Sequence, residues 1–347
     1  MSPFIVAALV SSLGLGTAIT FSSSHWLLAW MGLEINTLAI LPIMSKSHHP
    51  RAVEATTKYF ITQATAAAII LFASTTNAWT TGQWDIQQLA TPASTTMATF
   101  ALALKIGLAP VHFWLPEVLQ GLDLITGLIL STWQKLAPFA LLLQMTHLDP
   151  LLTTSLGLVS MFIGGWGGLN QTQLRKILAY SSIAHLGWMI VIIKFSPLLT
   201  ILSLALYIFM TTSAFFTLYI TKSTTINSLS TSWSYTPALT AFFPLVVLSL
   251  GGLPPLSGFM PKWLILQEIT NQGLPLLATI SALSALISLY FYLRLSYAMT
   301  LTSSPATSSA SVPWRLPGND FALPLAIAAS TSAMVLPLTP TFQAILH

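Results

Sequence analysis

Two segments of the chain repeat each other without a gap, and two prolines match position for position in these otherwise mostly apolar stretches. The first is Gly107-Leu-Ala-Pro-Val-His-Phe-Trp-Leu-Pro-Glu117, and the second is Gly252-Leu-Pro-Pro-Leu-Ser-Gly-Phe-Met-Pro-Lys262, at a constant offset of 252 − 107 = 145 residues. Proline has no backbone donor and clashes with the carbonyl group four residues earlier, so each segment interrupts a helix. Inside a membrane the freed backbone groups need protein or water partners, and paired interruptions of this kind are typical of transport paths.

The composition places these interruptions inside a membrane. Of the 347 residues, 54% are hydrophobic and only 6% are charged, whereas a soluble domain carries about 25% charged residues. Windows of about 20 apolar residues predict about eleven spanning helices. They lie near 3–22, 25–44, 55–79, 95–121, 124–145, 149–170, 173–194, 197–221, 238–271, 276–300 and 322–344. We therefore expect an all-α polytopic membrane protein.

The basic residues are concentrated in the loops on one side of the predicted membrane, and this distribution predicts the orientation of the chain. Most of them follow even-numbered spans, and Lys194 is the one exception after an odd span; the even-side group is Lys46, Arg51, Lys58, Arg175, Lys176, Lys222 and Arg315. Because loops on the inner side of a membrane are rich in Lys and Arg, the N-terminus is expected inside and the C-terminus outside.

The span order predicts an internal repeat. The two interrupted helices are the fourth and ninth spans, five apart, so they are expected to cross the membrane in opposite directions. This indicates two inverted repeats of five helices, residues 1–147 and 148–301, followed by a loop and one C-terminal helix in residues 302–347.

Four ionisable residues are expected near the middle of the membrane: Glu34, Lys105, Lys135 and Lys262. A charge at the centre of a spanning helix costs roughly 2.5–3.5 kcal/mol, so these side chains must face the interior of the helix bundle. Burial disfavours a charged lysine and a neighbouring carboxylate favours it, so the group is expected to share protons. Ammonium groups cannot coordinate sodium, and the set therefore favours proton transfer, with anion transport as the alternative.

Each of these residues has a structural alternative. Glu34 can serve only to hold a lysine, Lys105 and Lys135 can reach toward the interface, and Lys262 can cap freed carbonyl groups. His112, Glu117 and His185 are further candidate relays, because they lie in or near these spans and histidine titrates near neutral pH. The two histidines are equally consistent with structural hydrogen bonding, and Glu117 with a charge at the rim.

Signals for bound cofactors are absent from the sequence. The chain has no Cys, which excludes thiolate-held iron–sulfur clusters and Cys-ligated zinc here. It contains neither a G-x-G-x-x-G motif nor a P-loop, and no pair of histidines has the helical spacing that suggests haem. We expect no cofactor and no metal in this chain, and no nucleic-acid partner.

Four motifs resemble those of the mitochondrially encoded NADH dehydrogenase subunit 2 family, the chain 2 subunits of NADH-ubiquinone oxidoreductase. They are Trp30-Met-Gly-Leu-Glu-Ile-Asn36, Lys105-Ile-Gly-Leu-Ala-Pro-Val-His-Phe-Trp-Leu-Pro-Glu117, Trp133-Gln-Lys-Leu-Ala-Pro138 and Gly251-Gly-Leu-Pro-Pro-Leu-Ser-Gly-Phe-Met-Pro-Lys262. The resemblance covers essentially the whole chain. It extends more weakly to the antiporter-like subunits of respiratory complex I and to multisubunit cation/proton antiporters.

The resemblance implies a proton-translocating subunit of the complex I membrane arm, in the inner mitochondrial membrane, with its N-terminus toward the matrix and its C-terminus toward the intermembrane space. In that family Glu34 pairs with Lys105, Lys135 continues the path and Lys262 leads toward the next pump subunit. Flavin, iron–sulfur clusters and ubiquinone are expected in other subunits, and antiporter-like and accessory subunits are expected neighbours.

Two other functions stay open on the sequence alone. A stand-alone cation/proton antiporter uses the same fold and charges, and a passive scaffold of the membrane arm needs only the helices. Phospholipid contact is also expected, and the basic residues of the inner side are candidates for cardiolipin head groups: Lys46, Arg51, Arg175 and Lys176.

Overall fold

The computed structural model describes residues 2–46, 48–89, 91–234, 236–301 and 322–346. Within these ranges the chain is helical, with two isolated β-bridges and no β-strand. It divides into two compact units, residues 1–156 and 157–347. The predicted loop at 302–320, which includes Arg315, lies outside the described residues. The all-α polytopic fold class is confirmed.

Seven helices of the described chain are long and apolar enough to cross a membrane, and α15 (Ala322–Met334) with the segment that contains α16 (Thr339–Leu346) forms an eighth span if this pair, bent by 60°, is counted as one. The remaining predicted spans correspond to α9 (Leu174–Ile192) and to two interrupted pairs, α4 (Pro92–Ile106) with α5 (Trp114–Gly121) and α12 (Pro237–Gly251) with α13 (Phe259–Asn271). The total of eleven spans stays a prediction.

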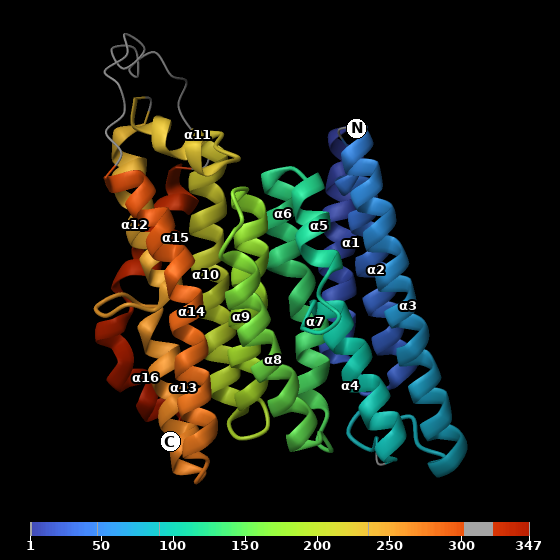
Figure 1. Ribbon diagram of the computed structural model, residues 1–347. Coiled ribbons are helices and arrows are strands. Elements are labelled where there is room, and N and C mark those ends of the chain that lie inside the picture. Colours follow the sequence, from blue (N-terminus) through green and yellow to red (C-terminus); the bar gives the residue numbers. More distant parts are fainter. Residues whose placement is uncertain (1, 47, 90, 235, 302–321, 347) are drawn as a thin grey trace. The chain divides into compact units, whose positions relative to one another are not determined.

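The first unit is built from helices that lie alongside one another in Figure 1, coloured from blue to green. Their bounds are α1 Pro3–Ser22, α2 Trp26–Met44, α3 Pro50–Thr81, α4 Pro92–Ile106, α5 Trp114–Gly121, α6 Leu124–Ser131 and α7 Trp133–Gln144. Helix α2 packs between α1 and α3, and α3 contacts both halves of the interrupted pair α4 and α5. Helix α8, Pro150–Gly168, carries the chain into the second unit.

The second unit is built from the helices that follow α8. Their bounds are α9 Leu174–Ile192, α10 Pro197–Thr221, α11 Ile226–Ser230, η1 Thr231–Ser234, α12 Pro237–Gly251, α13 Phe259–Asn271, α14 Pro275–Thr300, α15 Ala322–Met334, η4 Leu336–Leu338 and α16 Thr339–Leu346. Helix α10 packs against α9, α12, α13 and α15, and α14 lies against both halves of the interrupted pair α12 and α13.

Glycines allow the first two helices of each unit to approach closely. A Cβ atom added to Gly32 of α2 would lie 2.8 Å from the carbonyl oxygen of Gly16 in α1, and one added to Gly187 of α9 would lie 2.8 Å from that of Gly157 in α8. Such small residues are enriched where membrane helices pack backbone to backbone. The same device therefore joins α1 to α2 and α8 to α9.

Corresponding loops also pair in each unit. In the first, His25 and Asp85 form an antiparallel bridge that ties the α1–α2 loop to the α3–α4 loop. In the second, Gln173 and Thr225 form a bridge between the α8–α9 loop and the α10–α11 loop. The first bridge lies at the start of α2 and just after the end of α3, and the second lies at the start of α9 and just after the end of α10.

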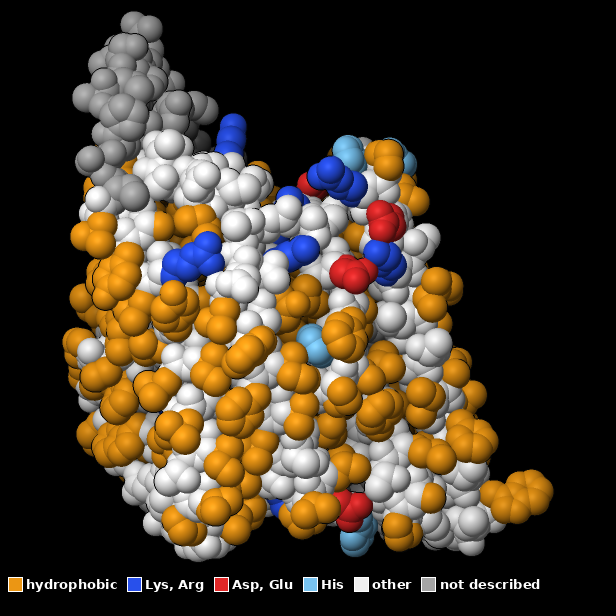
Figure 2. Space-filling view, viewed as in Figure 1, with side chains coloured by type: hydrophobic (Ala, Val, Ile, Leu, Met, Phe, Trp, Pro, Cys, Tyr) orange, Lys and Arg blue, Asp and Glu red, His pale blue; other side chains and the backbone are white. Residues whose placement is uncertain are grey.

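The outer surface is strongly apolar. Figure 2 shows hydrophobic side chains over most of the visible face of each unit, with charged side chains gathered near helix ends. Phe4, Trp79 and Leu151 are 86%, 92% and 83% exposed. A surface of this kind is stable only against lipid or other protein chains.

Candidate functional site: two interrupted helices with buried lysines

The first interruption lies between α4 and α5. Helix α4 ends at Ile106, and the next residue, Gly107, has a φ of 88°, in the left-handed region that glycine tolerates best. A Cβ atom there would lie 2.8 Å from Leu115 Cδ1, so close packing also favours glycine. The chain re-enters helix at Trp114.

Side chains from within the first unit satisfy the carbonyl groups that this interruption frees. Trp114 Nε1 donates to the Leu104 carbonyl at 3.0 Å, and Gln63 Nε2 of α3 donates to the Lys105 carbonyl at 3.4 Å. Both donors are uncharged. Two of the carbonyl groups that end α4 are therefore paired without using the lysine side chain.

Lys105 is consequently left with a free amine in the interior. The residue is 6% exposed, and among the described residues its Nζ has no hydrogen-bond partner. Glu34 of α2 attracts it electrostatically, and Glu34 Oε2 is likewise buried without a partner among those residues. The ion pairs within 4.0 Å in the described chain do not include these two groups. The pair expected from the family resemblance is thus an electrostatic pair without direct contact.

A small cavity connects Lys105 to Lys135. Both lysines line it, together with amide, hydroxyl and aromatic side chains that include Asn36, Gln63 and Gln134. Its volume of about 10 Å³ is close to the minimum that holds one water molecule. The Asn36 amide is also buried with both polar atoms unpartnered among the described residues. The structure therefore brings two of the predicted lysines to one polar cavity, which Glu34 does not line.

Lys135 lies just after a third interruption, which the sequence analysis did not predict. Helix α6 ends at Ser131 and α7 begins at Trp133. The Leu128 carbonyl receives the Thr132 backbone N–H at 3.0 Å, the Thr132 hydroxyl at 2.7 Å and the Ser131 hydroxyl at 3.0 Å. Serine and threonine hydroxyls that bond back to the helix backbone bend it. This adjacent hydroxyl pair is the only sequence signal, since proline is absent from the break.

The second interruption reproduces the first at the same offset of 145 residues. Helix α12 covers Pro237–Gly251 where α4 covers Pro92–Ile106, and α13 begins at Phe259 where α5 begins at Trp114. Gly252 has a φ of 75°, matching Gly107, and the cis peptide bonds precede Pro110 and Pro255. The sequence repeat is therefore a structural repeat of the interrupted helix.

Different groups satisfy the carbonyls at this second interruption. Lys262 Nζ donates to the Gly251 carbonyl at 2.7 Å. His185 Nε2 lies 3.1 Å from the Leu250 carbonyl, and its Nδ1 lies 2.7 Å from the Ser181 carbonyl. A neutral imidazole has one N–H, so both contacts are hydrogen bonds only when the ring holds two protons. Lys262 and His185 line one cavity of about 20 Å³.

This geometry tests the structural alternative for Lys262, in which its amine caps carbonyl groups freed by the break. Its amine does cap a carbonyl freed by the break, and the side chain lies over Gly252, where an added Cβ would be 2.9 Å from Nζ. The capping interpretation describes the bond that the structure contains, and it is compatible with proton transfer because an ammonium group has two further N–H groups.

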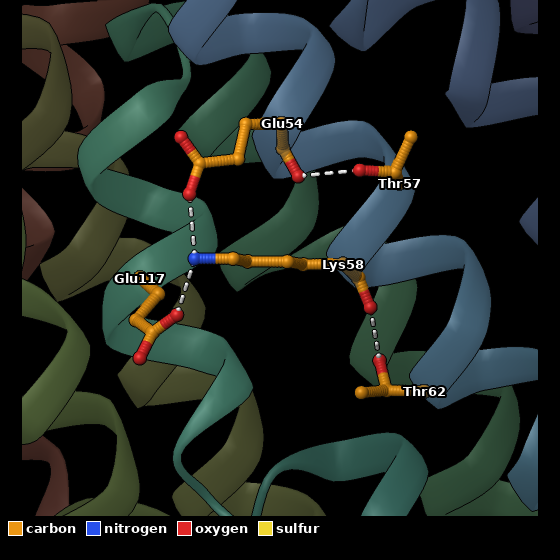
Figure 3. A network of polar contacts seen from close by, with 5 residues as sticks. All are labelled: Glu54, Thr57, Lys58, Thr62 and Glu117. Atoms are coloured by element: carbon orange, nitrogen blue, oxygen red, sulfur yellow. Dashed lines mark hydrogen bonds and ion pairs between the residues drawn. The ribbon is translucent and has the colours of Figure 1, made fainter.

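Two candidate relays lie away from the lysine cavities. His112 is buried between α4 and α5, with Nδ1 3.3 Å from the Pro110 carbonyl. Glu117 is half exposed and accepts a hydrogen bond of 2.8 Å from Lys58, which also pairs with Glu54 at 2.8 Å. Figure 3 shows the Lys58 amine between the two carboxylates. Neither His112 nor Glu117 lines the cavity shared by Lys105 and Lys135.

The sequence analysis missed several uncharged polar residues of the site. Asn36, Gln63 and Gln134 line the first cavity, and Ser203 lines the second. Amides in the middle of apolar spans were a usable signal, because each brings hydrogen-bonding groups that lipid cannot satisfy. Among the described residues, no group of three or more His, Asp or Glu side chains is placed to hold a metal ion.

Comparison with known proteins decides the family. The family model for NADH:quinone oxidoreductase/Mrp antiporter transmembrane segments matches residues 23–288, and that for the NADH dehydrogenase subunit 2 C-terminus matches residues 289–343. NADH-ubiquinone oxidoreductase chain 2 of Oncorhynchus mykiss is 67% identical across 100% of this chain and 99% of its own length. The chain belongs to the NADH-ubiquinone oxidoreductase chain 2 family. The resemblance expected from the four motifs is confirmed.

Other relatives agree. The Carassius auratus protein of the same name is 66% identical over 98% of both chains. A chain of respiratory complex I from Thermus thermophilus, solved with bound aureothin, has a TM-score of 0.77 at 27% identity, covering 97% of this chain and 80% of that one. A chain of the Mrp complex from Dietzia has a TM-score of 0.80 at 18% identity over 97% and 75% of the two chains, and it shares the fold.

Proposed function

We propose that this chain translocates protons across the inner mitochondrial membrane as a core membrane-arm subunit of respiratory complex I. The driving force is NADH:ubiquinone electron transfer, which takes place in other subunits that hold the flavin, iron–sulfur clusters and ubiquinone. Membership of the NADH-ubiquinone oxidoreductase chain 2 family supports this assignment. The partners are other membrane-arm subunits, including antiporter-like and accessory ones.

One observation carries the proposal: Lys105 and Lys135 share a buried polar cavity, and the Lys105 amine has an electrostatic partner in Glu34 with no hydrogen bond among the described residues. Glu34 stabilises the charge of the Lys105 amine electrostatically, without direct contact. A change in the Glu34–Lys105 separation therefore changes the proton affinity of Lys105. A released proton passes to Lys135 through the cavity.

In the second unit we assign Lys262 as the next carrier and His185 as its relay. Their shared cavity and their bonds to adjacent carbonyl groups support this pairing. His112 and Glu117 are assigned lesser roles, at the first break and at the surface. We further propose that residues 1–147 and 148–301 are inverted repeats, a layout supported by the matching glycine contacts, loop bridges and helix interruptions.

Orientation and lipid contacts complete the proposal. The sorting of basic residues places the N-terminus toward the matrix and the C-terminus toward the intermembrane space. Lys46, Arg51, Arg175 and Lys176 then lie on the matrix side, where anionic cardiolipin head groups are the expected ligands. A native-lipid density map that lacks head groups beside these residues contradicts the lipid assignment.

The test is Lys105→Gln and Glu34→Gln in intact complex I, reconstituted into sealed liposomes. We expect each variant to assemble and to lower the number of protons moved per NADH oxidised. Lys222→Gln, at an exposed loop lysine, is the charge-matched control and leaves the ratio unchanged.

Two outcomes distinguish the rival functions. An unchanged proton ratio in both variants, with normal assembly, supports the passive scaffold and contradicts the proposal. Cation-dependent proton exchange by the purified chain without an electron donor supports a stand-alone antiporter.

A further inference from the structure

The side-chain amide of Asn36 is a buried polar group to which the proton path described above gives no role. Asn36 lies on α2, two residues after Glu34, and it is 2% exposed. Its Oδ1 and Nδ2 atoms are both buried, and neither has a hydrogen-bond partner among the described residues. Burial of an amide without a partner is unfavourable, so such a group indicates a bound water molecule or a role in the chemistry.

Two neighbouring helices hold Asn36 at the cavity that Lys105 and Lys135 share. Gln134 Nε2 of α7 donates to the Asn36 backbone carbonyl at 3.4 Å. On the side of α1, a Cβ atom added to Gly16 would lie 2.5 Å from Asn36 Oδ1, so α1 packs directly against the amide. The side chain is therefore fixed between α1 and α7, and it lines the same cavity as the two lysines.

Other polar side chains of this lining already bond to the backbone. Gln63 and Trp114 donate to the carbonyl groups that end α4. The Thr37 hydroxyl donates to the Glu34 carbonyl at 2.9 Å. Within the described part of the chain, Asn36 is therefore the amide of this lining whose oxygen and nitrogen are both buried and unpartnered. Its hydrogen-bonding groups are available to a molecule in the cavity.

The size and the chemistry of the cavity fit one water molecule. Its volume of about 10 Å³ is that of a single water site. A buried water needs about two to four polar partners, and Lys105, Lys135 and the Asn36 amide can supply them. An amide offers both a donor and an acceptor and carries no titratable proton. It can therefore hold the water in a fixed orientation without taking up the transferred proton itself.

We propose that Asn36 is the positioning residue for a water molecule that bridges Lys105 and Lys135. This inference rests on the proposed function and deepens it. The water accepts a hydrogen bond from the Lys105 ammonium and donates one to the neutral amine of Lys135, while the Asn36 amide fixes its orientation. One N–H bond breaks at Lys105 and one forms at Lys135. The water gains one proton as it loses another, so atoms and charge balance.

The test replaces the amide by an apolar side chain in intact complex I in sealed liposomes. We expect Asn36→Leu to reduce proton flux through this chain by about 10²-fold, as for a reacting group misplaced by about 1 Å. The number of protons moved per NADH then falls to that of Lys105→Gln. Asn36→Val gives the same result with a smaller side chain, so the test does not depend on whether leucine fits beside Gly16. Asn36→Ser keeps a donor and an acceptor and retains most of the flux.

Thermal unfolding of the same complexes separates positioning from structural support. Asn36→Leu is expected to leave the melting temperature unchanged or raised, because the side chain has no hydrogen bond among the described residues to lose. Asn77 is the matched contrast: it is equally buried in the first unit, but its Nδ2 donates to the Gln83 carbonyl at 3.2 Å. Asn77→Leu lowers the melting temperature and leaves the proton ratio unchanged. Asn227→Leu, at an exposed position, changes neither.

The outcomes distinguish this inference from the proposed function. If Lys105→Gln lowers the proton ratio but Asn36→Leu and Asn36→Val do not, the role of Asn36 is overturned and the proposed function stands. If none of the three changes the ratio, both fail. If all three Asn36 variants, including Asn36→Ser, lose proton flux and melting temperature together, the amide only supports packing, and its role at the water is overturned.

Discussion

At the first helix break two uncharged side chains, Gln63 and Trp114, donate to the carbonyls that end α4, whereas at the second break Lys262 and His185 bond to those that end α12. The backbones match in helix bounds and in the left-handed glycine. Two interrupted helices with matching backbones can therefore differ in whether the buried lysine beside the break makes a hydrogen bond among the described residues. Lys105 makes no such bond, and Lys262 makes one.

The largest difference between an effect on proton translocation and an effect on stability is expected from Lys105→Met. Proton translocation through this chain falls by about 10²-fold, because a proton carrier is lost. Thermal stability stays close to that of the natural complex, since the amine has no hydrogen bond among the described residues to lose. Proton-to-NADH ratios and thermal unfolding of reconstituted complex I measure both effects. A large loss of stability would show that Lys105 also supports the fold.

Lys262→Met is expected to reduce both proton movement and stability. It leaves the Gly251 carbonyl without the donor at 2.7 Å, which costs about 1–3 kcal/mol for a buried acceptor. The same thermal measurement compares it with Lys105→Met. Equal stability of the two variants would remove the distinction between the breaks.

Alanine in place of the left-handed glycines separates backbone from side-chain effects. Gly107→Ala and Gly252→Ala each incur about 1–2 kcal/mol of backbone strain. At position 252 the new Cβ also meets the Lys262 side chain, with Nζ at 2.9 Å. We therefore expect Gly252→Ala to reduce proton flux more than Gly107→Ala at similar thermal stability. The opposite order of fluxes would contradict the role assigned to Lys262.

The smallest effect is expected at the surface triad of Figure 3. Glu117→Gln removes one carboxylate from Lys58, which keeps Glu54. Exposed ion pairs contribute little to stability and are weakened by salt. The melting temperature is expected to shift slightly at low ionic strength and not at high ionic strength. A strong loss of proton flux would instead place Glu117 in the relay.

Membrane class, family and the two proline-containing breaks follow from the sequence, because apolar run length and a missing backbone donor act locally. The third break, at Thr132, could not be predicted in this way. Hydroxyls bond back to Leu128 there, yet the pairs Ser181–Ser182 and Thr211–Thr212 make bonds of the same kind inside α9 and α10 without a break. The break is important for the site because it precedes Lys135 by three residues.

Residue type alone determined that Glu34, Lys105, Lys135 and Lys262 had to avoid lipid, since an isolated charge in hydrocarbon is too costly. Only the tertiary structure decided which of them share a cavity and which carry a hydrogen bond. Glu117 and Lys262 occupy equivalent positions in the repeat, yet one pairs at the surface and the other caps an interior carbonyl. Lys58 is 59 residues from Glu117 and reaches it because α3 packs against α5, whereas Gly251 is only 11 residues from Lys262, on the other side of the same helix break.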